Sequence, residues 1–488
     1  MAATLIEYRS VSWGLGGFLA ALAGLMLVPL GFAAIQDHTD TEAFALGAGI
    51  TLTAAALLLL IGHQRPRQEL RLREALLLVV LAWVAICVFG GLPLWFTPTY
   101  PGFTDAVFES TSGFTTTGAT VIADVDGLSR PVNLWRCFSH WVGGMGIILL
   151  GLAVLPLLGQ GGTALYRAEF SGSSAERLRP RVLETARSLW RIYLLLTALE
   201  VLCLTAAGMD GFEALCHAFS TLGTGGFSTR TASIAGFKSP LIEYIVTVFM
   251  LLGGISFAQH FRLWVERQPR AALGDYEVRS YLAIAAAASV IIGASLLGDG
   301  DMAREPALRA ALFQTVSILT TTGFATADYT QWQPLTQLIL MVLMFIGGCT
   351  GSTAGGLKVA RVVLLMQLIR REFRRFTEPL GVFRIRVGGV VVPDHAICGL
   401  LNLIFLALLL MLAASLVLTA CGIDLVTAVS AVVACQFNVG PGLGGVGPTA
   451  NYGDLPALAK WTLTFCMIAG RLEFYTFLVV MTRVFWRR

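Results

Sequence analysis

The chain has 488 residues, of which 56% are hydrophobic and only 13% are charged, and its formal net charge is +4. A soluble protein would carry about 25% charged residues. This composition excludes an ordinary soluble protein and predicts an integral membrane protein. The cysteines form no CxxC pair, so neither a zinc site nor a disulfide framework is expected.

The first two apolar stretches, at about 13–34 and 43–62, are each long enough to cross a bilayer as a helix. The link between them, 37–42, is acidic, whereas the link after the second contains Arg65, Arg67, Arg71 and Arg73. Basic links tend to stay in the cytoplasm, so we expect a cytoplasmic N-terminus. Residues 1–73 lack the loop motif described below and are interpreted as a two-helix appendage.

From residue 74 onward, one unit recurs four times: a span, a short helix, a loop rich in Thr and Gly, and a returning span. The predicted repeats are 74–187, 188–278, 279–396 and 397–488. Their first spans are placed at about 74–96, 188–208, 280–297 and 397–420, and their short helices at about 105–112, 211–220, 306–319 and 424–435. The returning spans are placed at about 134–158, at 241–264, from 335 onward, and at 457–480.

Charged residues orient these repeats. The links after the returning spans are basic, with Arg167 and Arg177 after the first, Arg267 and Arg270 after the second, and Arg370 and Arg371 after the third. We therefore expect all four loops to face outward and the C-terminus to be cytoplasmic. Asp105, Asp210 and Asp424 stand where they can cap the short helices and make the outer mouth acidic.

The four loops predict a cation filter. They are Thr116-Thr117-Gly118-Ala119, Gly223-Thr224-Gly225-Gly226, Thr321-Thr322-Gly323-Phe324 and Asn438-Val439-Gly440-Pro441, and we align Gly118, Gly225, Gly323 and Gly440. Glycine allows backbone conformations that aim consecutive carbonyls at one line. Four such loops around one axis could replace the water around a cation. Ordinary outer turns are the alternative for a single loop, but the recurrence favours a filter.

The third returning span is interrupted. Residues 347–356 cannot form a comfortable helix, because each Gly costs about 1 kcal/mol relative to Ala. The residues of interest are Gly347, Gly348, Thr350, Gly351, Ser352, Gly355, Gly356 and Lys358. A movable gate, a helix kink and a close helix-packing site are all compatible with this pattern. The G-K-[ST] ending of a nucleotide-binding phosphate loop is absent after Gly351, so nucleotide binding is not expected.

Arg471 lies within the last predicted span. A charge at mid-bilayer costs at least about 2.5–3.5 kcal/mol, so this side chain should face a cavity or a partner. An ion pair with Glu473 or Glu200 is one possibility.

Several motifs together resemble the TrkH/KtrB/HKT superfamily of potassium transporters, and TrkH-type chains most of all. The resemblance covers nearly the whole chain, including the two extra N-terminal spans. It is carried by His217-Ala218-Phe219-Ser220-Thr221 before the second loop, by residues 348–358 and 438–442, and by Gly470-Arg471-Leu472-Glu473.

The resemblance implies an all-α integral membrane fold with four pseudo-symmetric M1–P-loop–M2 repeats, like a potassium channel pore. It also implies a homodimer in the bacterial inner membrane, K⁺ as the transported ion, no organic cofactor, and a cytoplasmic TrkA-like ring that binds NAD(H), ATP or ADP. In this family, the loop at 347–356 would gate the pore under the filter, and Arg471 would reach into it as an electrostatic barrier.

The sequence also bears on two other function classes, an enzyme and a coupled transporter. No HExxH or GxSxG motif is present, so an enzyme is not expected, and neither is a nucleic-acid partner. An obligately coupled K⁺/H⁺ or K⁺/Na⁺ symporter remains the alternative to a pore. Coupled transporters often contain inverted repeats, whereas the repeats predicted here keep one orientation.

Overall fold

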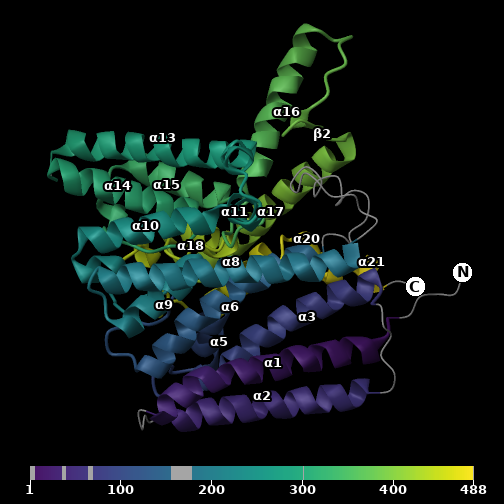
Figure 1. Ribbon diagram of the computed structural model, residues 1–488, viewed down its shortest axis with the longest axis vertical. Coiled ribbons are helices and arrows are strands. Elements are labelled where there is room, and N and C mark those ends of the chain that lie inside the picture. The colour runs from purple at the N-terminus through teal and green to yellow at the C-terminus, as the bar shows by residue number, and fades with distance from the viewer. Residues whose placement is uncertain (1–5, 36–39, 64–69, 155–177, 301, 487–488) are drawn as a thin grey trace, which may run out of the picture.

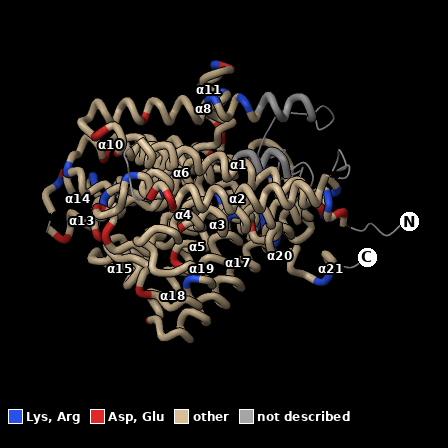
Figure 2. Tube along the Cα trace, turned by 90° about the horizontal axis from the view of Figure 1, so that it is seen from below, with Lys and Arg blue, Asp and Glu red and all other residues tan. Residues whose placement is uncertain are grey.

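The computed structural model describes the chain except for residues 1–5, 36–39, 64–69, 155–177, 301 and 487–488. Half of the acidic link at 37–42, Arg65 and Arg67, and Arg167 and Arg177 therefore lie outside the described residues. Within the described part, six helices are long and apolar enough to cross a membrane, or up to eight if each bent pair counts as one span. Figure 2 shows long stretches of these helices without Lys, Arg, Asp or Glu, as expected of membrane spans.

The N-terminal pair and the first unit form one side of the bundle (Figure 1). They comprise α1 (Tyr8–Ile35), α2 (Thr41–Gly62), α3 (Leu72–Gly90), α4 (Leu92–Trp95), the short helix α5 (Phe103–Phe114) and the returning helix α6 (Arg130–Val154). Small residues let α1 and α2 approach closely: a Cβ on Gly62 would lie 2.7 Å from the backbone nitrogen of Trp13. Such contacts drive helix association where lipid removes the hydrophobic effect.

The elements of the other three predicted repeats follow in chain order. The second contains α8 (Leu178–Ala206), α9 (Gly211–Leu222), η3 (Ser233–Phe237), α10 (Pro240–Gly254), α11 (Phe257–Trp264) and α12 (Pro269–Leu273). The third contains α13 (Tyr276–Asp299), α14 (Arg304–Leu319), η4 (Tyr329–Gln331), α15 (Pro334–Ile346), α16 (Val359–Thr377), and the antiparallel strands β1 (Arg386–Val387) and β2 (Val390–Val391). The fourth contains α17 (Asp394–Ala420), α18 (Leu425–Gln436), η5 (Gly444–Val446), α19 (Ala457–Arg471), α20 (Tyr475–Met481) and α21 (Arg483–Trp486).

Two returning spans that we predicted as continuous are broken. The chain bends by 101° between α10 and α11, and by 119° between α19 and α20. At the second bend, Glu473 and Phe474 both have a φ of 55°, and a positive φ cannot continue an α-helix. Neither residue is a glycine or a proline, so composition gave no warning of this break.

The predicted aspartate caps are partly correct. The side chain of Asp210 accepts a hydrogen bond from the Phe212 backbone at the start of α9, and that of Asp424 accepts one from Thr427 at the start of α18. Asp105 does not cap α5. It lies in the first turn and pairs instead with Lys460 of α19, at 2.6 Å from Nζ to Oδ1.

Glycines place the returning helices against the ends of the short helices. A Cβ on Gly143 of α6 would collide with the carbonyl oxygen of Phe114, the last residue of α5. A Cβ on Gly470 of α19 would collide with the carbonyl oxygen of Gln436, the last residue of α18. The absence of a side chain therefore brings α6 and α19 into direct contact with the ends of the short helices, where the Thr/Gly loops start.

We predict that Gly143→Ala and Gly470→Ala each destabilise the protein. The added methyl group overpacks a backbone contact, which typically costs about 1–3 kcal/mol. Gly24→Ala is the matched control, because a Cβ there meets open space and Ala favours a helix. The measurement is thermal unfolding of the detergent-purified protein. Equal melting temperatures for all three variants would contradict the packing role.

Candidate functional site

The four Thr/Gly loops share one backbone conformation. Each begins after a short helix with a Thr or Asn in the left-handed region, and a glycine in the same region follows two residues later. The φ values are 53°, 51°, 54° and 56° at Thr116, Thr224, Thr321 and Asn438, and 81°, 83°, 81° and 101° at Gly118, Gly226, Gly323 and Gly440. Positive φ is unusual for Thr, and its recurrence indicates a conformation held by the surrounding structure.

One hydrogen bond recurs in all four loops. The residue between the two left-handed positions donates its N–H to a carbonyl near the end of the preceding helix, at 2.8 Å each time. The pairs are Thr117 to Ser112, Gly225 to Ser220, Thr322 to Ser317 and Val439 to Ala434. This bond satisfies a helix-end carbonyl that would otherwise lack a donor and ties each loop to its short helix.

This geometry corrects the predicted register of the second loop. Gly226, and not Gly225, has the conformation of Gly118, Gly323 and Gly440. Phe227 therefore belongs to the second loop, and Gly223 lies before it as the C-cap of α9. Since residues 223–226 contain three glycines, composition alone could not fix the alignment.

The loops close into a ring. A Cβ on Gly118 would collide with the carbonyl oxygen of Gly225, and one on Gly226 with that of Thr322. In the same way, a Cβ on Gly323 would collide with the Val439 carbonyl oxygen, and one on Gly440 with the Thr117 carbonyl oxygen of the first loop. Each loop thus touches the next in the order one, two, three, four and back to one, and only glycine fits at each contact.

Two consecutive rings of main-chain carbonyls lie in these loops. The first belongs to Thr116, Thr224, Thr321 and Asn438, and the second to Thr117, Gly225, Thr322 and Val439. None of these carbonyls accepts a hydrogen bond from the described residues, and all eight residues are buried. Buried carbonyls without a donor are costly, so their concentration at one place indicates a ligand-binding role.

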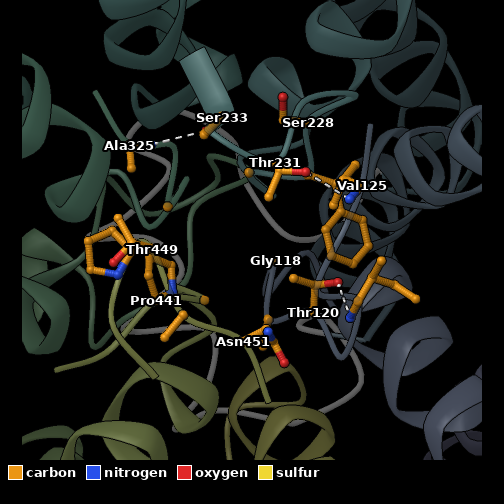
Figure 3. A pocket seen from close by; sticks show the side chains of 18 of the residues that line it. Gly118, Thr120, Val125, Ser228, Thr231, Ser233, Ala325, Pro441, Thr449 and Asn451 are labelled. Atoms are coloured by element: carbon orange, nitrogen blue, oxygen red, sulfur yellow. Dashed lines mark hydrogen bonds between the residues drawn. The ribbon is translucent and has the colours of Figure 1, made fainter. Parts of the chain in front are cut away.

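Beyond the glycines, the loops surround a pocket that all four units line (Figure 3). Gly118, Gly226, Gly323 and Gly440 line it, together with residues of the segments that follow them. Hydrogen bonds join neighbouring units around it: Thr231 Oγ1 accepts from the Val125 backbone at 2.9 Å, and Ser233 Oγ accepts from Ala325 at 3.2 Å. The ring therefore opens to one side of the molecule.

Behind the first two loops lies a buried ion pair that our sequence analysis missed. Nε of Arg136 on α6 is 2.8 Å from Oε1 of Glu109 on α5. Glu109 also accepts from Thr120 Oγ1 at 2.8 Å and from the Val121 backbone at 2.9 Å. The Arg136 guanidinium lies 4.2 Å from the centre of the Phe227 ring. The available signal was a lone arginine inside a predicted span.

The interruption at 347–356 lies directly against the filter loops. The Gly355 backbone N–H donates to Thr321 Oγ1 at 2.6 Å, and that of Gly356 donates to the Phe437 carbonyl at 3.1 Å. On its other side, the Cys349 backbone donates to the Gly254 carbonyl at 2.8 Å. The predicted gate residues thus contact Thr321, a predicted filter residue of the third loop, and Phe437, which directly precedes the predicted filter residue Asn438.

This segment is a closed loop and not a helix kink. The backbone N–H groups of Leu357 and Lys358 donate to the carbonyls of Phe345 and Ile346, both at 2.9 Å. These two bonds join the end of α15 to the residues just before α16. Residues 347–356 therefore form a loop that is closed at its base. Gly347, Gly351 and Gly356 have φ values of 75°, 74° and 76°, which a helix does not allow.

Three side chains form hydrogen bonds that hold this loop: one on α13, one in the loop, and one just after it. Oε1 of Glu277 on α13 accepts from the backbone and hydroxyl of Thr350, at 2.7 and 3.0 Å, and from the Ala360 backbone at 3.0 Å. The Ser352 hydroxyl donates to the Cys349 carbonyl at 2.6 Å. Lys358 is buried, and its Nζ donates to the Ala354 carbonyl. These bonds therefore anchor the loop at both ends.

Arg471 joins this loop to the first unit. Its Nη1 donates to the Thr353 carbonyl at 3.0 Å, and its Nη2 to the Gly143 carbonyl at 3.3 Å. The residue is only 3% exposed, and its Nε has no hydrogen-bond partner among the described residues. The alternative, an ion pair of Arg471 with Glu473 or Glu200, is not formed. Glu473 pairs with Arg361 at 2.6 Å, and both carboxylate oxygens of Glu200 lack a hydrogen-bond partner among the described residues. A buried guanidinium held by carbonyls alone keeps its positive charge uncompensated.

A local repeat explains the position of Arg471. Each returning span carries a pair that begins with glycine: Gly143-Gly144, Gly253-Gly254, Gly347-Gly348 and Gly470-Arg471. Arg471 therefore takes the place of a glycine beside the loops. The sequence contained this signal, and aligning the four returning spans would have revealed it.

Comparison with known proteins agrees with this geometry. The family model named TrkH, described as a cation transport protein, matches residues 41–485. The Trk system potassium uptake protein TrkH of Halomonas elongata is 42% identical over 97% of this chain and 98% of its own length. The protein of the same name from Escherichia coli K12 is 37% identical over 99% of this chain and its full length.

A solved structure extends the similarity to the fold. The crystal structure of the potassium transporter TrkH from Vibrio parahaemolyticus superposes with a TM-score of 0.91 at 37% identity and covers 99% of this chain and all of that one. The chain therefore belongs to the TrkH family, a family of cation transport proteins and not of enzymes.

Proposed function

We propose that this chain is the pore subunit of a potassium uptake system and that its four Thr/Gly loops form the selectivity filter. One observation carries the proposal: two rings of buried carbonyls without hydrogen-bond donors, in loops that close on each other. A dehydrated K⁺ could take these carbonyls in place of its water. Relatives that match nearly the whole chain are named potassium uptake proteins, which supports the choice of ion.

The short helices would assist the ion electrostatically. α5, α9, α14 and α18 each end at a filter loop, so the negative ends of four helix dipoles lie beside the ring. Selection of K⁺ over Na⁺ should be looser than in a channel whose loops all carry a second glycine. Gly442 is the second glycine of the fourth loop, whereas the corrected register places Thr120, Ser228 and Ala325 at the equivalent positions.

The gate would consist of the loop at 347–356 and Arg471. The loop touches the Thr321 hydroxyl and the Phe437 carbonyl, immediately beside the filter, so an ion leaving the ring would meet it. Arg471 adds an uncompensated positive charge at the same level, through its bond to the Thr353 carbonyl. Opening would then require the loop to release its contacts with Glu277 and with the filter.

The surroundings of the pore follow from the charge pattern and the relatives. We propose an inner-membrane location in a bacterium, with both termini in the cytoplasm, because the links that follow the returning spans are rich in arginine. We also propose a homodimer and a cytoplasmic TrkA-like partner ring that binds NAD(H), ATP or ADP. The relatives' name, a Trk system, supports a multi-component assembly.

The direct test is the reversal potential of the purified protein in liposomes. A pore predicts that this potential follows the K⁺ gradient and does not shift when only the pH gradient changes. The control is empty liposomes with the same gradients. A reversal potential that moves with the pH gradient would overturn the pore in favour of an obligately coupled symporter.

We predict that Gly226→Ser and Gly323→Ser each reduce the preference for K⁺ over Na⁺, by roughly tenfold if about 1.4 kcal/mol of ion discrimination is lost. The new side chain would collide with the carbonyl of the next loop and would require a strained positive φ. Gly445→Ser is the control, because a Cβ there makes only ordinary contacts of 3.5 Å. The assay is rubidium uptake in competition with sodium, and wild-type selectivity in both filter variants would refute the filter.

We predict that Arg471→Ala raises cation flux, by roughly tenfold if the arginine adds about 1.4 kcal/mol to the barrier. Arg471→Lys, which keeps the charge, should remain close to wild type. Flux is measured as rubidium uptake per unit of protein in the membrane. An unchanged flux in well-expressed Arg471→Ala would contradict the barrier role.

A further inference from the structure

Helix α16 departs from the direction of its neighbours. In Figure 1 it starts near one end of α13 and points away from α13, α14 and α15, crosswise to their direction, while β2 lies near its base beside α17. If those helices cross the membrane, then α16 extends along the membrane surface. The segment 370–386 of α16 and the hairpin holds six arginines and two glutamates, a net charge of +4 that equals that of the whole chain.

Five of these arginines surround one pocket between α16 and the strand that follows. They are Arg370, Arg371, Arg374, Arg384 and Arg386. Only Arg371 has carboxylate partners, with Glu372 at 3.0 Å and Asp394 at 2.9 Å. The other four have no carboxylate within 4.0 Å among the residues that the structure describes. The pocket is therefore an uncompensated site for an anion.

The walls of this pocket are held in place by a small core. Leu364 of α16 packs with Ile385, Val387 and Val392 of the hairpin region and with Ile397 of α17. The backbone pairing of β1 with β2 adds to this support. Arg384 and Arg386 alternate with the buried Ile385 and Val387, so strand geometry turns both arginines to the opposite face from the core. The pocket is a feature of the fold and not of a free tail.

An apolar stripe lies beside the arginines. Met366, Ile369, Phe373 and Phe376 recur at helical spacing on α16 and are 50, 44, 69 and 88% exposed. Leu380 and Val382 continue the stripe at 99 and 86% exposure. A helix with apolar residues on one face and arginines on the other is typical of the membrane interface, where its apolar face enters the acyl layer.

We propose that this pocket binds the phosphate headgroup of an anionic phospholipid, whose acyl chains lie along the stripe from Met366 to Phe376. Guanidinium groups bind phosphate oxygens through two parallel hydrogen bonds, and four unpaired arginines can surround one headgroup. A free phosphate would use the charge but leave the apolar stripe unexplained. The inference rests on the proposed membrane orientation of the chain, because it places α16 at the cytoplasmic leaflet.

The test is native mass spectrometry of the full-length, detergent-purified protein with phosphatidylglycerol or phosphatidylethanolamine of identical acyl chains. The wild type should bind phosphatidylglycerol preferentially, and Arg370→Gln/Arg374→Gln should reduce that preference by roughly fivefold per arginine removed. Arg384→Gln, on the other wall, should act in the same direction. Arg267→Gln/Arg270→Gln is the matched control, since both arginines are exposed in a different basic link and should not affect the preference.

Several outcomes would overturn the proposal. Equal binding of the two lipids by the wild type would do so, as would a preference that the pocket variants leave unchanged. Millimolar inorganic phosphate carries no acyl chains. If it displaced bound phosphatidylglycerol, the pocket would be assigned to a soluble anion. If the pocket variants no longer formed a dimer but kept the lipid preference of the wild type, the stripe would be assigned to contact with a second copy of the chain. Lipid binding is measured without transport, so this inference and the proposed pore can fail separately.

Discussion

The structure depends on one contact that recurs four times: a glycine of one loop lies against a main-chain carbonyl of the next. Gly118, Gly226, Gly323 and Gly440 each make this contact, and no side chain would fit at any of them. Because the contacts run in a circle, no loop can move alone. The ring thereby fixes the eight carbonyls that have no hydrogen-bond donor, which the protein could not hold buried at membrane depth without a ligand or water.

The neighbouring elements can be understood as supports for this ring. The short helices anchor each loop through one shared hydrogen bond, and the returning helices reach their ends through glycines such as Gly143 and Gly470. The ion pair of Glu109 with Arg136 fixes the first two loops from behind. The loop at 347–356 lies against the filter loops, and Arg471 binds this loop, next to the glycine pairs of the returning helices. Selectivity and gating would then rest on adjacent parts of one packed structure.

Much of this could be predicted from the sequence, because recurrence and hydrophobic length are local signals. The short helix α18 and the interruption after Ile346 agree with the expectations, and the family resemblance is confirmed. The register of the second loop could not be predicted, since Gly223, Gly225 and Gly226 are equivalent in composition. The bends at Ile255 and Glu473, and the partner of Asp105, depend on tertiary contacts that no local pattern encodes.

The most direct test of the central claim is a diffraction map of the protein grown with thallium or rubidium, recorded at the absorption edge of the ion. The account predicts anomalous density on the axis of the four loops, bounded by the carbonyls of Thr116, Thr224, Thr321 and Asn438 and of Thr117, Gly225, Thr322 and Val439. A map with fully occupied ions elsewhere and none between these carbonyls would contradict it.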